Sequence, residues 1–280
     1  MSEQVERHPI TLKKVRYTMP GVEAVTVRRN VAYKAGDDAL TMDVYYPPDA
    51  NNATRIPAVV IVLGYPDVRV PNPLGCQFKE MGLSVSWARL LAASGMAAII
   101  YTTRNPATDV HAVLQHIRQN AAWLGVDDHR IGIFAASGNV VVALSGLMQD
   151  PELKCAALLY GFTLDLDGST AVAEAAKTFG FVNACAGQSV DDLPSHIPLF
   201  VARAGEDQFG GLNGALDCFL MKALGRNLRV SFVNHATGAH GFDLDDDSGS
   251  SREIVRQVLA FLRFHLVATS RPAEAPLHST

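Results

Sequence analysis

Apolar runs of strand length recur through the middle of this chain, and they limit its fold more than any other feature. Residues 58–63, AVVIVL, carry an apolar side chain at every position, so neither face of this strand can lie against water. Further strands are predicted at residues 96–101, 130–135, 155–160, 199–204 and 229–233. Strands that are buried on both faces are typical of a parallel sheet with helices on both sides.

Helical periodicity fills the segments between these strands. It is clearest over residues 109–124, where apolar side chains recur every three or four positions up to Gly125. Other helices are predicted at residues 84–94, 140–148, 212–224 and 253–266. The last one is expected to begin with a capping box from Ser250 to Glu253. This alternation predicts an α/β fold with a mostly parallel central sheet.

An antiparallel hairpin is predicted before the first parallel strand. Residues 22–33 and 40–46 are rich in β-branched and aromatic side chains, and residues 35–38 between them have the composition of a turn. Residues 22–266 are expected to form one domain, with an N-terminal arm at residues 1–21 and a flexible tail at residues 267–280. Residues 162–198 are longer than a normal connection, contain one short helix at residues 170–177, and are expected to overhang the sheet as a small cap.

Composition argues against several classes of protein. Hydrophobic residues make up 48% of the chain and charged residues 19%, which excludes disorder over most of its length. The net charge of -4, without a block of Lys or Arg, disfavours nucleic-acid binding. No apolar run has the length of a membrane helix or a secretory signal, and the scattered cysteines fit reduced thiols, so a cytoplasmic protein is expected. The low charge and the exposed hairpin edge favour a homodimer.

The most informative segment is residues 130–140, RIGIFAASGNV, where a buried strand runs into Ser137 and then a helix. This order is typical of a nucleophile elbow, a sharp turn that exposes a serine. The turn needs small residues two positions before and after the serine, and here Ala135 and Asn139 stand there, so G-x-S-x-G has become A-x-S-x-N. The Gly138 N–H at the helix start can stabilise an oxyanion. Taken alone, the pattern also fits a serine that simply caps the helix.

Partners for such a serine follow two later strands. Asp207 comes directly after the strand at residues 199–204, and His235 and His240 lie in the loop after the final strand. The carboxylate and an imidazole in this order complete the residue types of a Ser-His-Asp triad. Weaker candidates for the acid are Glu206, Asp165 and Asp167.

With these residues the chain resembles the α/β-hydrolases, and within them the dienelactone-hydrolase-like branch. The matching segments within residues 40–266 are the elbow, GED at residues 205–207 and HGF at residues 240–242. The resemblance implies the α/β-hydrolase fold and assigns the general base to His240. His235 is then expected to cap its loop, with orientation of Asp207 as the alternative. Dienelactone hydrolases carry a cysteine nucleophile, whereas this chain has Ser137, which favours a serine esterase.

A mechanism follows from these roles. His240 removes the Ser137 proton, and Asp207 orients the imidazole and stabilises its charged form. The oxyanion is bound by the Gly138 N–H and by a second N–H from the loop after residues 58–63, most simply that of Tyr65. Tyr65 could instead offer its hydroxyl to the substrate or pack the loop.

A pocket of apolar side chains is expected beside the serine. Its candidate residues are Phe162, Phe179, Phe181, Phe209, Phe242 and Cys76, with core packing as the alternative for each of them. The acidic run at residues 243–249 lacks the spacing of a calcium loop and is expected to be a solvated loop. No metal-binding or nucleotide-binding motif is present, so neither a metal nor a cofactor is expected.

Together these features predict a hydrolase that cleaves small carboxylic esters through an acyl-enzyme. The same triad could cleave a lactone, a dienelactone or a thioester, and the sequence does not separate these substrates. A hydrolase fold that has lost catalysis would act as a binding protein instead. The altered elbow is the one feature that favours this last alternative.

Overall fold

One sheet of eight strands crosses the whole molecule, in the order β1-β2-β4-β3-β5-β6-β7-β8. The strands are β1 (Thr26–Lys34), β2 (Leu40–Tyr46), β3 (Ile56–Ile61), β4 (Ala97–Tyr101), β5 (Val126–Ala136), β6 (Ala156–Leu159), β7 (Leu199–Ala204) and β8 (Val230–His235). The computed structural model describes residues 7–35, 40–50, 54–67 and 74–267. Within these ranges β1 and β2 pair antiparallel, β2 joins β4 antiparallel, and the other neighbours are parallel. The predicted parallel sheet with a leading antiparallel hairpin is confirmed.

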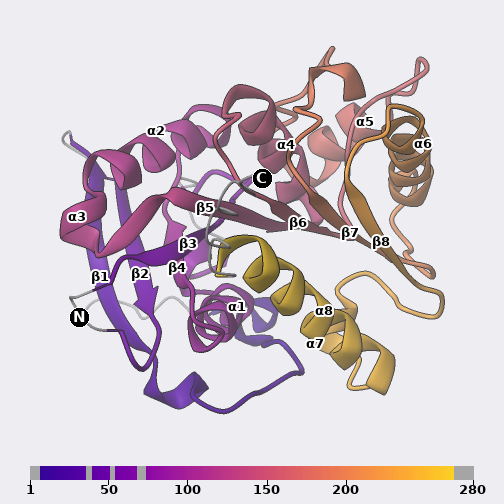
Figure 1. Ribbon diagram of the computed structural model, residues 1–280. Helices are drawn as coiled ribbons and strands as arrows, with labels where there is room; N and C mark the ends of the chain where they lie inside the picture. The colour runs from indigo at the N-terminus through magenta and orange to yellow at the C-terminus, as the bar shows by residue number, and fades with distance from the viewer. Residues whose placement is uncertain (1–6, 36–39, 51–53, 68–73, 268–280) are drawn as a thin grey trace, which may run out of the picture.

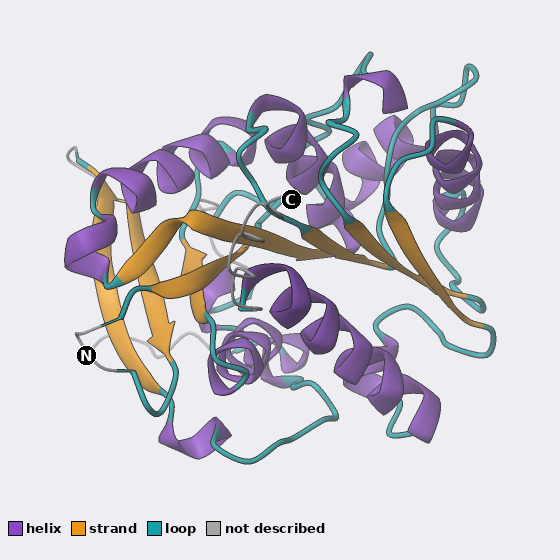
Figure 2. Cartoon of the chain, viewed as in Figure 1, coloured by secondary structure: helices purple, strands orange, loops and turns teal. Residues whose placement is uncertain are grey.

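Helices cover both faces of this twisted sheet (Figures 1 and 2). They are α1 (Gly82–Ala93), α2 (Pro106–Gln119), α3 (Ala121–Leu124), α4 (Val140–Gln149), α5 (Ala171–Phe179), α6 (Leu212–Gly225), α7 (Phe242–Asp245) and α8 (Gly249–Leu266). Helices α1 and α8 lie on one face, and α2, α4 and α6 lie on the other. Every residue of β4 is buried, because this strand lies between β2 and β3 in the sheet and α1 packs against it. None of the helices in the described ranges has the length and apolar character needed to cross a membrane.

A buried ion pair ties the hairpin to the segment before α1. The short 3-10 helix η3 (Phe78–Glu80) carries Lys79, whose side chain is only 3% exposed. Its Nζ donates to Asp43 Oδ1 of β2 at 2.8 Å and to Asn30 Oδ1 of β1 at 2.5 Å. A buried charge is tolerated when it is paired and hydrogen-bonded in this way. The contact fixes the position of η3, which forms part of the cavity wall described below.

Several predicted elements differ from the structure at their boundaries. The strand expected from residue 22 begins at Thr26, because Gly21, at φ 87°, starts the short 3-10 helix η2 (Val22–Ala24) instead. The single helix expected over residues 109–124 is divided into α2 and α3 at Asn120, whose side-chain amide donates to the His116 carbonyl at 2.9 Å. An asparagine that bonds to the backbone competes with the helical hydrogen bonds. The expected turn at residues 36–38 and the tail at residues 268–280 lie outside the described residues.

The acidic segment before α8 is folded more tightly than predicted. Ser248, not Ser250, is the N-cap of α8, and its Oγ accepts a hydrogen bond from the Ser251 N–H at 3.2 Å. The predicted capping box is therefore wrong. The expected solvated loop is wrong at Asp243, which is only 1% exposed, and Asp246 accepts hydrogen bonds from Ser248 and Ser251, whereas Asp245 and Asp247 are exposed as expected.

The long segment at residues 162–198 contains the expected short helix, α5, and a single 3-10 turn, η5 (Val190–Asp192). Asp165 accepts hydrogen bonds from the Val172 and Ala173 N–H groups at 2.8 and 3.0 Å, and so holds the first turn of α5. After α5 the chain reaches the loop that follows β3, where the Val182 N–H donates to the Gly64 carbonyl at 2.9 Å. The segment thereby reaches the edge of the sheet that carries Ser137.

Candidate active site

Ser137 stands at a sharp turn between β5 and α4. It lies in the 3-10 turn η4 (Ser137–Asn139) with φ at 59°, a left-handed conformation that is unfavourable for a residue with a side chain. Neighbouring glycines make the turn possible: a Cβ on Gly64 would come within 2.6 Å of the Gly138 carbonyl oxygen, and one on Gly161 would overlap the Val140 side chain. The space that the motif normally gains from glycines beside the serine thus comes from other loops.

Asn139, the unusual residue of the elbow, crosslinks two loops of the site. Its Nδ2 donates to the Ala136 carbonyl at 2.9 Å, and its Oδ1 accepts the Gly64 N–H at 2.7 Å. The Gly64 carbonyl is held in turn by Val182. The loop after β3 is therefore held by Asn139 of the elbow on one side and by Val182, after α5, on the other.

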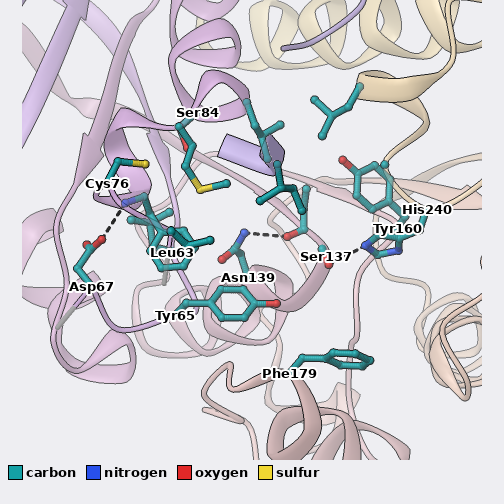
Figure 3. A pocket seen from close by; sticks show the side chains of 18 of the residues that line it. Leu63, Tyr65, Asp67, Cys76, Ser84, Ser137, Asn139, Tyr160, Phe179 and His240 are labelled. Carbon is teal, nitrogen blue, oxygen red and sulfur yellow. Dashed lines mark hydrogen bonds between the residues drawn. The ribbon is translucent and has the colours of Figure 1, made fainter. Parts of the chain in front are cut away.

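Ser137, His240 and Asp207 form one continuous hydrogen-bonded chain. Ser137 Oγ lies 2.8 Å from His240 Nε2, and His240 Nδ1 lies 2.7 Å from Asp207 Oδ2. The other carboxylate oxygen of Asp207 accepts the Phe209 N–H at 3.0 Å. The Asp207 side chain is fully buried and that of His240 is 14% exposed, so the chain opens to solvent only at its serine end. Figure 3 shows the imidazole directed toward Ser137.

The topology explains why residues so far apart in the sequence meet here. Ser137 follows β5, Asp207 follows β7 and His240 follows β8, and these strands run parallel. The carboxyl ends of parallel strands meet at one edge of a sheet, so the loops after them share one side of the molecule. The structure brings together the three residues that the sequence analysis selected.

Two aromatic rings enclose the His240 imidazole. The centroids of the Phe209 and Tyr160 rings lie 4.4 and 4.9 Å from it, both edge-on. The Tyr160 hydroxyl donates to Asp243 Oδ1 at 2.6 Å, and Trp87 Nε1 donates to Asp243 Oδ2 at 2.8 Å. Burial raises the pKa of Asp243, although the two donors act in the opposite direction. Burial, together with the neighbouring Asp243 charge, also raises the pKa of Tyr160, so its hydroxyl keeps its proton.

The sequence analysis missed Tyr160 and Asp243. Tyr160 follows β6 and Asp243 lies in α7, separated by 83 positions in the chain. The one signal in the sequence was that Asp243 stands three residues after His240. Because this carboxylate belongs to an acidic run, the composition pointed to a solvated loop instead.

Tyr65 and Gly138 lie side by side across the elbow. A Cβ on Gly138 would come within 2.5 Å of the Tyr65 hydroxyl oxygen. The Tyr65 ring stacks on Phe78 with centroids 5.4 Å apart and meets Phe181 edge-on at 6.0 Å. Tyr65 therefore packs its loop and also presents its hydroxyl beside Ser137, as Figure 3 shows.

A cavity of about 370 Å³ opens beside Ser137 and His240. Most of its wall is apolar and comes from Ile10, Leu63, Tyr65, Pro66, Leu74, Cys76, Phe78, Met81, Leu83, Phe179 and Leu244. Its polar members include Asp67, Ser84 and Asn139. Burial raises the pKa of Asp67, whose two oxygens accept the Phe78 and Thr103 N–H groups. Such a cavity suits a small, largely apolar ligand.

Of the residues predicted to line the pocket, Cys76 and Phe179 do so in the described part of the chain. Phe162 and Phe242 are 2% and 1% exposed. They belong to the core, which was the alternative to a place in the pocket wall. Phe209 packs against His240, and Phe181 against Tyr65 and Phe162. The pocket wall is built more from the segment around η3 and α1 than from the aromatic residues that follow β6.

The other candidates for catalysis lie away from the hydrogen-bonded chain. His235 is buried and its Nε2 lies 2.8 Å from Ser251 Oγ, which joins β8 to α8. Glu206 is exposed, and Asp167 pairs with Lys222 at 2.7 Å. Asp165 holds α5, as described above. The contacts of His235, Asp165 and Asp167 account for these three side chains within the fold.

No family model matches the sequence, and no curated protein does. Solved structures are similar to it in fold. An α/β-hydrolase enzyme from the metagenome of Lake Arreo in Spain is 17% identical, over 86% of this chain and 82% of that one, with a TM-score of 0.66. A hyperthermophilic esterase from Pyrobaculum calidifontis is 18% identical, over 88% and 90% of the two chains, with a TM-score of 0.65. An esterase from Thermogutta terrifontis, phosphoramylated by tabun, is 19% identical, over 89% and 95%, with a TM-score of 0.61. The chain has the α/β-hydrolase fold, as predicted.

Proposed function

We propose that this protein is a serine hydrolase that cleaves small carboxylic esters, with Ser137, His240 and Asp207 as its catalytic triad. The observation that carries the proposal is the unbroken hydrogen-bonded chain from Ser137 Oγ through the imidazole to a fully buried carboxylate. A serine is a weak nucleophile unless a base beside it removes its proton, and His240 stands at the distance required. Similarity in fold to two esterases also supports the proposal.

The reaction proceeds through an acyl-enzyme. Ser137 Oγ attacks the ester carbonyl carbon while its proton passes to His240 Nε2, and Asp207 stabilises the resulting imidazolium. The carbon–oxygen bond to the alcohol then breaks, and His240 gives its proton to the departing oxygen. Water attacks the acyl-enzyme with His240 again as the base, which releases the acid and restores Ser137.

Gly138 and Tyr65 are the proposed oxyanion donors. The Gly138 N–H lies at the start of the turn into α4, where backbone donors and the helix dipole favour a negative oxygen. The Gly64 N–H already donates to Asn139, so the next N–H of that loop, from Tyr65, is the natural second donor. The Tyr65 hydroxyl, which lies over Gly138, is a further candidate for the same role.

The substrate class follows from the cavity. Its apolar wall and small volume favour a short ester, and the same triad would cleave a lactone of the dienelactone type or a thioester as alternatives. Cys155, Cys185 and Cys218 are thiols without a disulfide, which supports a reducing, cytoplasmic location for this protein. The homodimer expected from the hairpin edge stays a prediction.

A fluorophosphonate probe tests the proposal directly. We expect intact-mass analysis to show a single adduct, peptide mapping to place it on Ser137, and an activated short-chain ester to give a burst of product. Ser137→Ala should abolish both adduct and burst, and His240→Ala should lower labelling by about 100-fold or more, because general base catalysis is lost.

Ser250→Ala is the matched control, since this serine is exposed and lies outside the site. It should label and turn over like the unaltered protein. Absence of an adduct in protein that is folded by circular dichroism would contradict the proposal and favour the binding-protein alternative. Ester hydrolysis that persists undiminished in Ser137→Ala would overturn the assignment of the nucleophile.

A further inference from the structure

The N-terminus of α1 opens on the substrate cavity. Leu83 and Ser84, in the first turn of this 12-residue helix, line the cavity wall. The N-cap residue Met81 provides no side-chain hydrogen bond, and the first turn contains no acidic residue. The Val85 N–H donates to the Met81 carbonyl, but no described residue accepts from the N–H groups of Leu83 and Ser84. A helix start of this kind offers donors to an oxygen atom.

The Ser84 hydroxyl is an independent sign of a ligand at this place. Ser84 is only 6% exposed, yet its Oγ has no hydrogen-bond partner among the described residues. Serines in the same helix behave differently: Ser86 Oγ donates to the Gly82 carbonyl at 2.7 Å, and Ser94 Oγ donates to the Leu90 carbonyl at 2.8 Å. The hydroxyl oxygen itself is not fully enclosed by protein, so water or a ligand in the cavity can form the hydrogen bond that the protein does not. Ser84 lines the cavity, where a substrate would meet it (Figure 3).

The charges around the cavity decide what kind of oxygen fits. No Lys or Arg belongs to the cavity wall as described, and the carboxyl group of Asp67 does belong to it. Among the described residues of the wall, a carboxylate on the substrate would therefore meet no cationic side chain, and it would lie close to a second carboxyl group. A neutral acceptor, such as a ketone or ether oxygen, accepts hydrogen bonds from the same donors without this cost.

The arrangement also indicates which arm of the ester reaches Ser84. The departing alcohol must face His240, which protonates it. Figure 3 shows Ser84 on the side of Ser137 away from His240. The acyl arm, bound to Ser137 on the other side, is the part directed toward Ser84.

We propose that Ser84 and the first turn of α1 form a specificity subsite for a neutral acceptor oxygen on the acyl chain, so that oxo- or alkoxy-substituted acyl esters are preferred over plain alkyl esters. This inference rests on the proposed esterase function. The volume and apolar wall of the cavity indicate only a short ester, and this inference adds which kind of acyl group is preferred. The remaining wall beside Ser84, from Leu63, Met81 and Leu83, holds the methylene groups of the chain.

The test compares nitrophenyl esters of matched length. The panel contains pentanoate and 4-oxopentanoate, hexanoate and 5-oxohexanoate, methoxyacetate and butanoate, and the monoester of glutarate as the carboxylate probe. We expect the best oxygenated ester to exceed its alkyl counterpart in kcat/KM by about fivefold, the range of one neutral hydrogen bond. Ser84→Ala should bring this ratio close to one, and Ser84→Thr, which keeps the hydroxyl, should retain it. Ser86→Ala is the matched control and should leave both the ratio and the activity unchanged.

Three results would overturn the inference. They are a ratio near one for every matched pair in the unaltered protein, a preference that survives Ser84→Ala, and a preference for the glutarate monoester over both neutral series. In each case the plain alkyl esters are still hydrolysed, so the proposed function stands. Failure of that function looks different, because no ester of the panel is then turned over and Ser137 takes up no fluorophosphonate.

Discussion

At the scale of single residues, Asn139 has the most specific role outside the triad. One amide joins the end of β5 to the loop after β3 through hydrogen bonds to Ala136 and Gly64. This loop carries Tyr65, one of the proposed oxyanion donors. A change at Asn139 should therefore affect the reaction through the position of that loop.

Replacement by the residue usual in the motif tests this role. We expect Asn139→Gly to lower kcat by about tenfold to 100-fold, because an oxyanion donor that moves loses much of its effect. The free energy of unfolding should fall by about 1–3 kcal/mol, since the Gly64 N–H loses its acceptor and Gly adds freedom to the unfolded chain. Steady-state kinetics and urea denaturation measure the two effects.

Ala135→Gly is the matched control, because it restores the other glycine of the motif and removes no side-chain hydrogen bond. It should change kcat by less than about threefold. An Asn139→Gly protein as active as the unaltered one would show that the crosslink does not position the loop. Elbow residues act here by what they contact, and not by how closely they match the motif.

The same distinction explains which site residues could be predicted. Ser137, Asp207 and His240 each follow a strand, and their order in the chain is a pattern that a sequence displays. The Tyr160–Asp243 contact has no such pattern, because it depends on how the turn after β6 faces α7 in the folded molecule. Contacts between side chains of different loops are decided by packing, which neither periodicity nor motif spacing encodes.

At the scale of elements, strands and helices were predicted well at their centres and less well at their ends. The centre of α2 follows from apolar spacing, whereas its end at Asn120 depends on one side-chain hydrogen bond. The strand β5 begins at Val126, before the strand predicted at residues 130–135, and Val126 pairs with Ile56 of β3. Ends depend on local competition for backbone hydrogen bonds, which composition does not reveal.

The start of α8 offers a direct test at this scale. Ser248 is the N-cap, and its Oγ accepts the Ser251 N–H and donates to Asp246 at 2.7 Å. We expect Ser248→Ala to lower the free energy of unfolding by about 1 kcal/mol, the usual loss for an N-cap serine. Chemical denaturation followed by circular dichroism measures the change.

Ser250→Ala is the comparison, because the sequence pattern had placed the cap there. As an exposed residue inside the helix, it should change stability by less than about 0.5 kcal/mol, or stabilise slightly, since alanine is the better helix former. A larger loss at Ser250 than at Ser248 would contradict the observed cap and restore the predicted one. The pair separates the two positions without touching the active site.

At the scale of the whole molecule, the fold was predictable because burial on both faces of successive strands allows few architectures. The mostly parallel pairing follows from that constraint, whereas the order of the strands within the sheet was not predicted. The cavity was not predictable in detail. Its wall combines the N-terminal segment, the η3 region and α7, which the chain topology brings together from three distant places.

Partly buried histidines make the stability of the fold depend on pH. His111 lies half-buried in α2, and its Nε2 has no hydrogen-bond partner among the described residues. Burial lowers the pKa of His111, and the nearby Asp150 charge only partly opposes this effect. Burial also lowers the pKa values of His116 and His265. All three imidazoles are thus held neutral in the folded chain at a pH where they become protonated in the unfolded chain.

The sign of the pH dependence follows from proton binding. Below about pH 6.5 the unfolded chain takes up protons at these histidines before the folded chain does, so stability is lost as the pH falls. Burial raises the pKa values of Asp67 and Asp243, and these two groups act in the opposite direction. A variant of one histidine isolates its own contribution from that background.

We therefore expect His111→Gln to lose less thermal stability between pH 7.5 and pH 5.5 than the unaltered protein does. Differential scanning calorimetry at several pH values measures the difference in Tm. The exposed His129 supplies the control for the substitution, and His129→Gln should keep the pH dependence that His111 causes. Parallel Tm curves for His111→Gln and the unaltered protein would mean that His111 takes up its proton in the folded chain as readily as in water.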